Sequence, residues 1–145
     1  MKKIFLAALI LGCSFRVLAD DPTVDEKVLT AFNKTFQYAQ DVSWTVHTQS
    51  FEVKFKQDEI TSRVTYDKEG NIIKTYRYYR EDRLPLMVLA KLKNRYPDKS
   101  IYGVVEESSE EGTTYHVTLE DAKNCLDVRA DLYGGIYQVK KMKKA

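Results

Sequence analysis

The sequence has few of the residues on which catalytic and metal sites are usually built. It contains two cysteines, two histidines and one tryptophan among 145 residues, and it has no glycine-rich phosphate loop. His47 and His116 show no HExxH motif or other short metal-ligand spacing, so two exposed strand histidines are a simpler interpretation than a shared metal site. An enzyme should bring a nucleophile, a base and an orienting group together, and no such set is apparent. We therefore predict a non-enzymatic protein with no cofactor and no metal.

Long hydrophobic runs are also missing. The apolar run from Ile4 to Leu11 follows two lysines and is too short to cross a bilayer. With a small residue at position 19, this segment predicts a secretory signal peptide over residues 1–19, cleaved after Ala19. The alternative is a lipoprotein site at Leu11-Gly12-Cys13, which would anchor the chain through Cys13. The chain is accordingly expected to be periplasmic or secreted, with no transmembrane segment after processing.

The mature chain, residues 20–145, lacks a large excess of either charge. The whole chain has 23 basic and 21 acidic residues, and the signal peptide accounts for Lys2, Lys3 and Arg16. A nearly neutral remainder argues against nucleic acid as a partner, because binding nucleic acid requires a strong basic field. Its length fits a single domain with a real core. Cys125 is its only cysteine, so no intrachain disulfide can form, and the apolar neighbour Leu126 favours a buried thiol.

The mature chain contains an internal repeat. Three apolar positions with helical spacing recur at an offset of 60 residues: Val28 with Val88, Phe32 with Leu92, and Phe36 with Tyr96. At an offset of 64 the strand-like FEVKF at 51–55 aligns with YHVTL at 115–119, and Asp67 and Gly70 align with Asp131 and Gly134. We therefore predict two repeats, covering about residues 22–80 and 83–144.

Each repeat is predicted to begin with a helix and to continue with four strands. Thr23 and Glu26 have the spacing of a capping box for the first helix, and Pro85 suits the first position of the second. The strand candidates are 42–47, 51–56, 61–66 and 72–79 in the first repeat, and 101–106, 113–119, 125–130 and 136–142 in the second. Short turns between them imply antiparallel pairing. The acidic residues 106–112 are interpreted as a solvated hairpin loop.

Alternating apolar and polar residues predict one covered and one open sheet face. Trp44, Phe32, Phe55 and Leu92 are expected to be buried in one core shared by both repeats. Polar residues fall on the opposite face. The predicted fold is α+β: two tandem α-β4 repeats that form one curved antiparallel sheet of about eight strands, with the helices on one face.

The segment TYRYYRED, residues 75–82, ends the first repeat. Because strand side chains alternate, Tyr76 and Tyr78 share one face while Arg77 and Tyr79 share the other. The register of the preceding strands predicts Arg77 and Tyr79 on the open face, whereas a β-bulge would exchange the two pairs. Packing of the repeat junction and binding of a partner are both compatible with these residue types.

Three segments resemble the PepSY-like, β-lactamase-inhibitor-like family of secreted bacterial proteins: AFNKTFQYAQDVSWTVHTQSFEVKF, VTYDKEGNIIKT and LPLMVLAKLKNRYPDKSI. The matching features are structural and include Phe32, Trp44, Asp67 with Gly70, and Leu84-Pro85. The resemblance implies export and the tandem fold described above. Inhibitors of similar fold clamp an enzyme against the open sheet face. The resemblance therefore implies, on the basis of shape alone, that this chain inhibits an enzyme. The single mature cysteine departs from the disulfide-bearing inhibitors, and no β-lactamase contact is carried over.

The open face is where we expect a partner to bind. The candidate partner-binding residues there and at the repeat junction are Lys54, Arg63, Arg77, Tyr79, His116 and Arg129. We expect this face to be positive in the first repeat and more neutral in the second, where Glu106 and Asp127 contribute. The predicted function is a protein-binding module that inhibits or regulates an envelope or secreted protein. The alternative is a small-ligand or metal-binding protein that uses the cleft between the repeats.

Overall fold

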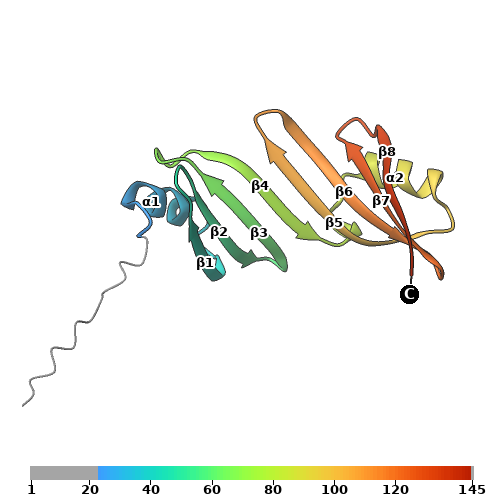
Figure 1. The fold of residues 1–145 in the computed structure, drawn as a ribbon, viewed down its shortest axis with the longest axis horizontal. Coiled ribbons are helices and arrows are strands. Elements are labelled where there is room, and N and C mark those ends of the chain that lie inside the picture. The colour runs from blue at the N-terminus through green and yellow to red at the C-terminus, as the bar shows by residue number, and fades with distance from the viewer. Residues whose placement is uncertain (1–22, 145) are drawn as a thin grey trace, which may run out of the picture.

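The computed structural model describes residues 23–144 (Figure 1). The predicted signal peptide, including Cys13, lies outside these residues. The elements are α1 (Glu26–Thr35), β1 (Gln40–Val46), β2 (Phe51–Gln57), β3 (Ile60–Tyr66), β4 (Ile72–Tyr79), the short helix η1 (Glu81–Arg83), α2 (Leu86–Arg95), β5 (Ser100–Ser109), β6 (Gly112–Glu120), β7 (Asn124–Asp131) and β8 (Ile136–Lys143). Among residues 23–144, no helix is long and apolar enough to cross a membrane.

The eight strands form one antiparallel sheet whose spatial order is the order of the sequence. On one face, Ser62 of β3 lies opposite Arg77 of β4, which lies opposite Glu106 of β5, which in turn lies opposite Tyr115 of β6. This line of residues joins the part of the face under α1 to the part under α2, so both helices cover the same face (Figure 1). The predicted α+β fold and its helix-covered face are confirmed.

The two helices begin and end in the same way. The carbonyl groups of Asp25 and Pro85 each accept a bond of 3.0 Å, from the Leu29 and Leu89 amides respectively. The predicted capping box is wrong: Asp25 is the N-cap of α1, and no side chain among residues 23–144 caps this helix, because Thr23 lies two residues too early. Pro85 likewise stands one residue before α2.

The β3–β4 and β7–β8 turns have the same hydrogen bonds. The Asp67 carboxylate accepts bonds from the amides of Glu69 (3.0 Å) and Asn71 (2.8 Å). The Asp131 carboxylate accepts the equivalent two bonds, both at 2.8 Å, from residues 133 and 135. Gly70 and Gly134 follow with φ of +88° and +79°, which glycine adopts without strain. The offset of 64 residues seen in the sequence therefore relates equivalent turns.

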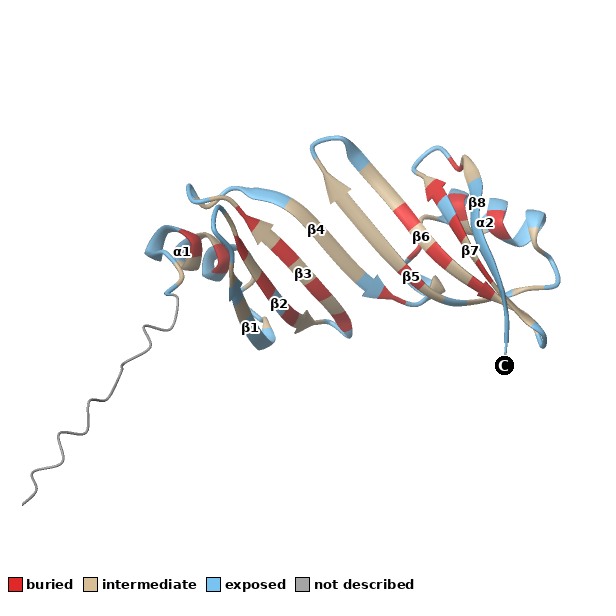
Figure 2. Ribbon diagram, in the orientation of Figure 1, coloured by how far each residue is buried: buried red, intermediate tan, exposed pale blue. Residues whose placement is uncertain are grey.

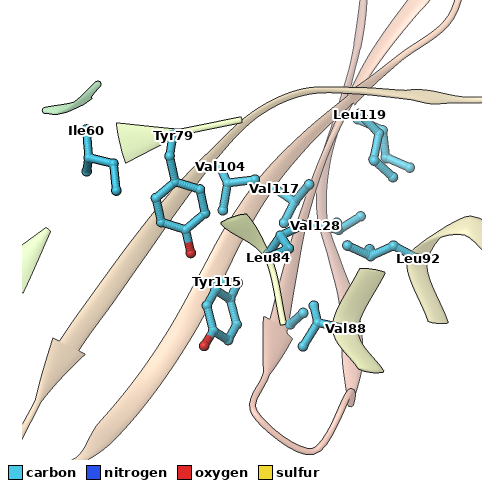
Figure 3. Close-up of a cluster of buried hydrophobic side chains, with 12 residues drawn as sticks. Ile60, Tyr79, Leu84, Val88, Leu92, Val104, Tyr115, Val117, Leu119 and Val128 are labelled. Atoms are coloured by element: carbon cyan, nitrogen blue, oxygen red, sulfur yellow. The ribbon is translucent and has the colours of Figure 1, made fainter. Parts of the chain in front are cut away.

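The buried residues form two clusters, visible as two red areas in Figure 2. One lies under α1 and comprises Val28, Phe32, Phe51, Val53, Phe55, Val64 and Tyr66. The other lies under α2 and includes Ile60, Tyr79, Leu84, Val88, Leu92, Val104, Tyr115, Val117, Leu119 and Val128 (Figure 3). The single shared core that the sequence suggested is therefore wrong. A polar seam on β4 and β5, formed by Thr75, Arg77, Glu106 and Ser108, lies between the clusters.

Three of the four predicted core residues, Phe32, Phe55 and Leu92, are at most 3% exposed. Trp44 is only half-buried because β1 is an edge strand, although its ring packs edge-on against that of Phe32 at 5.3 Å. Cys125 is also half-exposed, contrary to the prediction of a buried thiol. Its partners across the strands are Glu120 and Met142, so it lies on the open face.

The acidic residues 106–112 do not form a loop. β5 continues through Ser109 and β6 begins at Gly112, so only Glu110 and Glu111 form the turn between them. Gly112 makes this tight connection possible because its φ of +122° is open only to glycine. Glu106 and Glu107 are consequently strand residues on opposite faces of the sheet.

Candidate functional site

Two rows of side chains cross the open face of the sheet. The strand registers place Lys54, Arg63, Tyr76, Glu107, Thr114 and Asp131 in one row. The other row contains Lys56, Thr61, Tyr78, Val105, His116, Arg129 and Tyr137. Directly opposite residues in adjacent strands are close enough for their side chains to interact. Because both helices pack on the other face, these rows form a surface open to a partner.

Four of the six predicted site residues lie in these rows: Lys54, Arg63, His116 and Arg129. Arg77 and Tyr79 do not. Arg77 is paired with the buried Ser62, and Tyr79 is 8% exposed within the core under α2. Their assignment to the open face is wrong, and Tyr76 and Tyr78 occupy that face instead.

A β-bulge at the start of β4 causes this exchange. Tyr66 pairs with Ile72, whereas the preceding residue Thr65 pairs with Lys74. Ile73 is therefore an extra residue on β4, and each later side chain of the strand is moved to the other face. The exchange that a bulge would produce, left open by the sequence, is the arrangement observed.

A polar network occupies the centre of the open face. The Lys74 ammonium donates to the Glu107 carboxylate at 3.0 Å and to the Tyr76 hydroxyl at 3.4 Å. His116 Nε2 lies 3.2 Å from the other Glu107 oxygen. The hydrogen bond between Lys74 and Glu107 lowers the pKa of the carboxyl group and raises that of the ammonium. Sequence reasoning missed Lys74, Tyr76 and Glu107, which alternation would have placed together once the bulge was known.

The charges of the open face differ between the repeats. In the first repeat, the cations of Lys54, Lys56, Arg63 and Lys74 outnumber Glu52, which lies 3.5 Å from Arg63. The second repeat contributes the carboxylates of Glu107, Asp127 and Asp131, beside the cations of Arg129 and of Lys140, which lies opposite Asp127. Glu106, which the sequence placed here, lies on the covered face. Glu107 supplies the negative charge in its place.

On the covered face, the polar seam has its own hydrogen-bonded cluster. The Tyr79 hydroxyl donates to the Glu106 carboxylate at 2.5 Å, and the Arg77 guanidinium donates to the same carboxylate at 3.2 Å. Burial, followed by this bond to Glu106, raises the pKa of Tyr79. Arg77 and Tyr79 therefore stabilise the repeat junction and are not exposed to an open-face partner.

Two tyrosine-to-phenylalanine substitutions should have opposite effects on stability. Tyr79→Phe removes a donor from the mostly buried Glu106 and should lower the free energy of unfolding by about 1–3 kcal/mol. Tyr66→Phe should be neutral or stabilising, because the Tyr66 hydroxyl is buried and has no hydrogen-bond partner within residues 23–144. Urea titration of both variants tests this pair. A loss of stability in Tyr66→Phe would show that its hydroxyl has a partner.

Tyr66 should also make the protein less stable in alkali. Burial raises the pKa of Tyr66 to about 12, so it stays protonated in the folded chain after it ionises in the unfolded chain near pH 10. The contribution of Tyr66 should therefore lower the free energy of unfolding by about 1.4 kcal/mol per pH unit between pH 10 and 12. The Tyr66→Phe variant should lose this contribution, and parallel urea titrations at pH 9, 10 and 11 would detect the difference. Identical pH profiles of variant and wild type would contradict the assignment.

The structure separates the two histidines. His47 follows β1 in the turn before β2, and His116 lies in β6, with four strands between β1 and β6. At about 4.8 Å per strand, they are too far apart to share a metal ion. Within residues 23–144, no three His, Cys, Asp or Glu side chains come together as a metal site. The cleft between the repeats is a hollow of about 630 Å³ whose walls include Ile60, Tyr78 and Tyr102.

No protein-family model matches the sequence, and no relative is found among curated proteins. The structure is similar to a BLIP-like protein from Bacteroides fragilis, with a TM-score of 0.63 and 20% identity over 83% of this chain and 86% of the other. It is also similar to a DUF2874 family protein from Bacteroides uniformis (TM-score 0.63, 14% identity, 83% and 90% covered). A candidate periplasmic protein from Bacteroides eggerthii matches with a TM-score of 0.64 and 12% identity, over 83% and 89% of the two chains. The chain therefore has the fold of the BLIP-like and DUF2874 proteins of Bacteroides.

Proposed function

We propose that this chain is an exported, non-enzymatic protein-binding module whose partner docks across the open face of the sheet. The observation that carries the proposal is the pair of uncovered rows, one with Arg63 directly opposite Tyr76 and the other with Tyr78 and Arg129. Tyrosine and arginine are the residue types that concentrate binding energy at protein interfaces. The polar face of an antiparallel sheet needs neither of them for solubility.

The centre of this face is already ordered before a partner arrives. The Tyr76 hydroxyl is within hydrogen-bond reach of Lys74 and Glu107, and Tyr78 lies opposite Val105. A side chain held in place loses less conformational entropy on binding, which favours affinity. The unequal charges of the two repeats would set the orientation of the partner and speed its encounter with the face.

The partner in this proposal is another envelope or secreted protein, whose activity the module inhibits or regulates. Export is supported by the signal peptide that the first residues predict and by the candidate periplasmic protein among the structural neighbours. A partner of this class would meet the module in the same compartment.

The proposal is tested with the double variant Arg63→Glu/Arg129→Glu, which reverses one charge in each row. Arg63 is about half-exposed and Arg129 is exposed, so thermal stability should change little. Capture of envelope proteins by the immobilised variant should fall at least about tenfold for the true partner, with a weaker dependence on salt. Quantitative mass spectrometry of captured proteins gives the measurement.

The matched control is Lys27→Glu/Lys68→Glu, which makes the same charge change away from the open face. Lys27 is an exposed residue of α1, and Lys68 is exposed in the β3–β4 turn. A partner captured by wild type and control but lost from the open-face variant supports the proposal. If the folded open-face variant captures the same proteins as wild type, the open face is not the binding site.

The hollow between the repeats supports a second candidate function, the binding of a small ligand. Its volume of about 630 Å³ is typical of ligand pockets, and Tyr78, Tyr79 and Tyr102 contribute aromatic walls. A ligand bound there would raise the melting temperature of wild type, and of the Arg63→Glu/Arg129→Glu variant by the same amount. This behaviour would distinguish it from an open-face partner.

A further inference from the structure

The second repeat exposes a group of large apolar side chains at one tip of the molecule. Leu86 and Met87 begin α2 and are 82% and 64% exposed, while Leu132 and Tyr133 in the β7–β8 turn are 49% and 87% exposed. We refer to these four residues as the apolar tip. In Figures 1 and 2, the β7–β8 turn and α2 lie at the same end of the molecule. Exposure of several large apolar residues together marks an interaction site more often than single exposed residues do.

The first repeat shows that the fold does not require these residues. At the equivalent positions, α1 begins with Glu26 and Lys27, and the β3–β4 turn carries Lys68 and Glu69. The two turns have the same hydrogen bonds, and the two helices bury the same positions. One chain therefore builds the same tip twice, once with charged residues and once with apolar ones. Folding alone therefore does not explain the exposed apolar residues of the second repeat.

A cationic hollow lies directly beside the apolar tip. It has a volume of about 370 Å³ and is lined by Lys91, Asn94, Arg95, Gly134 and Ile136. The Lys91 ammonium donates to the Tyr133 carbonyl at 2.8 Å, and the Arg95 guanidinium donates to the Ile136 carbonyl at 2.9 Å. These contacts join the hollow to the turn that holds half of the tip. Among the described residues, neither cation forms a salt bridge, so neither charge is neutralised by a carboxylate.

The first repeat again provides the comparison. The helix positions equivalent to Lys91 and Arg95 are Ala31 and Thr35, which carry no charge. Asn94, the third helix residue that lines the hollow, corresponds to Lys34, so the hollow has one cation more than the equivalent positions of the first repeat. The second repeat thus combines two neighbouring cations, Lys91 and Arg95, with four apolar side chains that the first repeat lacks at the same end of the same structural unit. Apolar residues that enter the boundary between headgroups and acyl chains, next to cations that bind lipid phosphate, are the features of a peripheral membrane surface.

We propose that the tip of the second repeat docks on a bilayer that contains anionic phospholipid. The phosphate group of a lipid lies in the cationic hollow between Lys91 and Arg95. The side chains of the apolar tip enter the interface beside it. This inference is independent of the open-face proposal, since the tip belongs to α2 and the β7–β8 turn.

Cosedimentation with vesicles tests the inference on the chain from residue 20 onward, which holds every helix and strand of the structure. Vesicles of phosphatidylcholine with one quarter phosphatidylglycerol are compared with vesicles of phosphatidylcholine alone. Binding to the anionic vesicles should be at least about tenfold stronger and should weaken as salt is raised. Equal sedimentation with both vesicles, or with neither, would overturn the proposal.

The variants borrow their residues from the first repeat, whose turn and helix accept them. Leu132→Lys/Tyr133→Glu replaces apolar tip residues with those of the β3–β4 turn, and should bind anionic vesicles at least about tenfold more weakly. Lys91→Ala/Arg95→Thr removes both cations of the hollow. It should weaken binding to anionic vesicles roughly 30-fold, because a basic residue near an anionic membrane surface contributes about 1 kcal/mol of binding free energy. Circular dichroism confirms that each variant is folded.

Two further arms identify the source of any binding. Lys141→Glu/Lys143→Glu changes the basic C-terminal strand, and a loss confined to this variant would assign vesicle binding to β8 and overturn the proposal. Inorganic phosphate at 50 mM should compete only weakly, because it lacks acyl chains to engage the apolar tip. If phosphate abolishes vesicle binding at matched ionic strength, the hollow is a site for free anions and the proposal of a lipid site is overturned. The proposal would also be overturned if Leu132→Lys/Tyr133→Glu and Lys91→Ala/Arg95→Thr both bound anionic vesicles as strongly as wild type.

Discussion

Replacing Phe32 with alanine is expected to lower the free energy of unfolding by about 3–5 kcal/mol. The Phe32 ring is 3% exposed and lies 5.3 Å from the rings of both Trp44 and Phe55. It also lies 5.5 Å from the ring of Phe36, so its removal leaves a cavity lined by three aromatic rings. Those rings are attached to three different elements or loops and cannot all close the gap. Urea titration of the variant gives the measurement.

Leu92→Ala is the matched substitution, because Leu92 occupies the same helix position in the second repeat and is 1% exposed. It should cost about 2–5 kcal/mol. The two buried clusters are separate, so amide exchange should rise most in β1–β3 for Phe32→Ala and most in β6–β8 for Leu92→Ala. An unfolding midpoint unchanged by Phe32→Ala would show that the helix face is wrongly assigned.

Gly70→Ala is expected to lower the free energy of unfolding by about 2–3 kcal/mol, through backbone strain and a steric contact. Gly70 has a φ of +88°, and a Cβ there would lie 3.2 Å from the carbonyl oxygen of Lys27 in α1. A left-handed backbone costs about 1–2 kcal/mol for a residue with a side chain. The contact adds to this cost because a helix carbonyl cannot move without moving its helix. Thermal and urea unfolding of the variant check the value.

Gly134→Ala isolates the contribution of that contact. Its φ of +79° is nearly the same, but the nearest atoms belong to the flexible Lys91 side chain. The lysine can swing away, at the loss of its bond to the Tyr133 carbonyl. We therefore expect a cost of about 1–2 kcal/mol, smaller than that of Gly70→Ala. The reverse order would mean that α1 yields more easily than the Lys91 side chain.

The existence and faces of most strands could be predicted from the sequence, because their alternation is strong. In β2, Phe51, Val53 and Phe55 alternate with charged residues, and all three are buried. Burial of one face selects the register, since a slip of one residue would expose every apolar side chain of the strand. The alternation of the sequence therefore predicts the correct face for Lys54 and Arg63.

The face of β4 could not be predicted, because its sequence provides no such constraint. Ile72 and Ile73 are both about 40% exposed, so neither indicates the direction of the core. The tyrosines and arginines that follow can occupy either face. The decision rests on the bulge, which depends on how the Asp67 turn meets its partner strand, a relation between segments that local alternation does not contain.

The polar seam could not be predicted from the sequence either. Helical and strand periodicity indicates which residues are buried, but it does not show whether two buried sets touch. Only the pairing of β4 with β5 brings Arg77 opposite Glu106 and leaves a hydrogen-bonded strip between the clusters. Trp44 is less buried than its alternation predicts for a related reason, since the order of the strands makes β1 an edge strand.

The extra residue at Ile73 makes the register of β4 tolerant of one deletion. Loss of that residue would remove the bulge and leave Tyr66 opposite Ile72 and Thr65 opposite Lys74, so every later side chain of β4 would keep its present face. Loss of a residue from the strand beyond the bulge would instead turn the side chains that follow it to the opposite face. Two single-codon deletions only a few positions apart would therefore have unequal consequences, one conserving the open face of this protein and the other exchanging part of it.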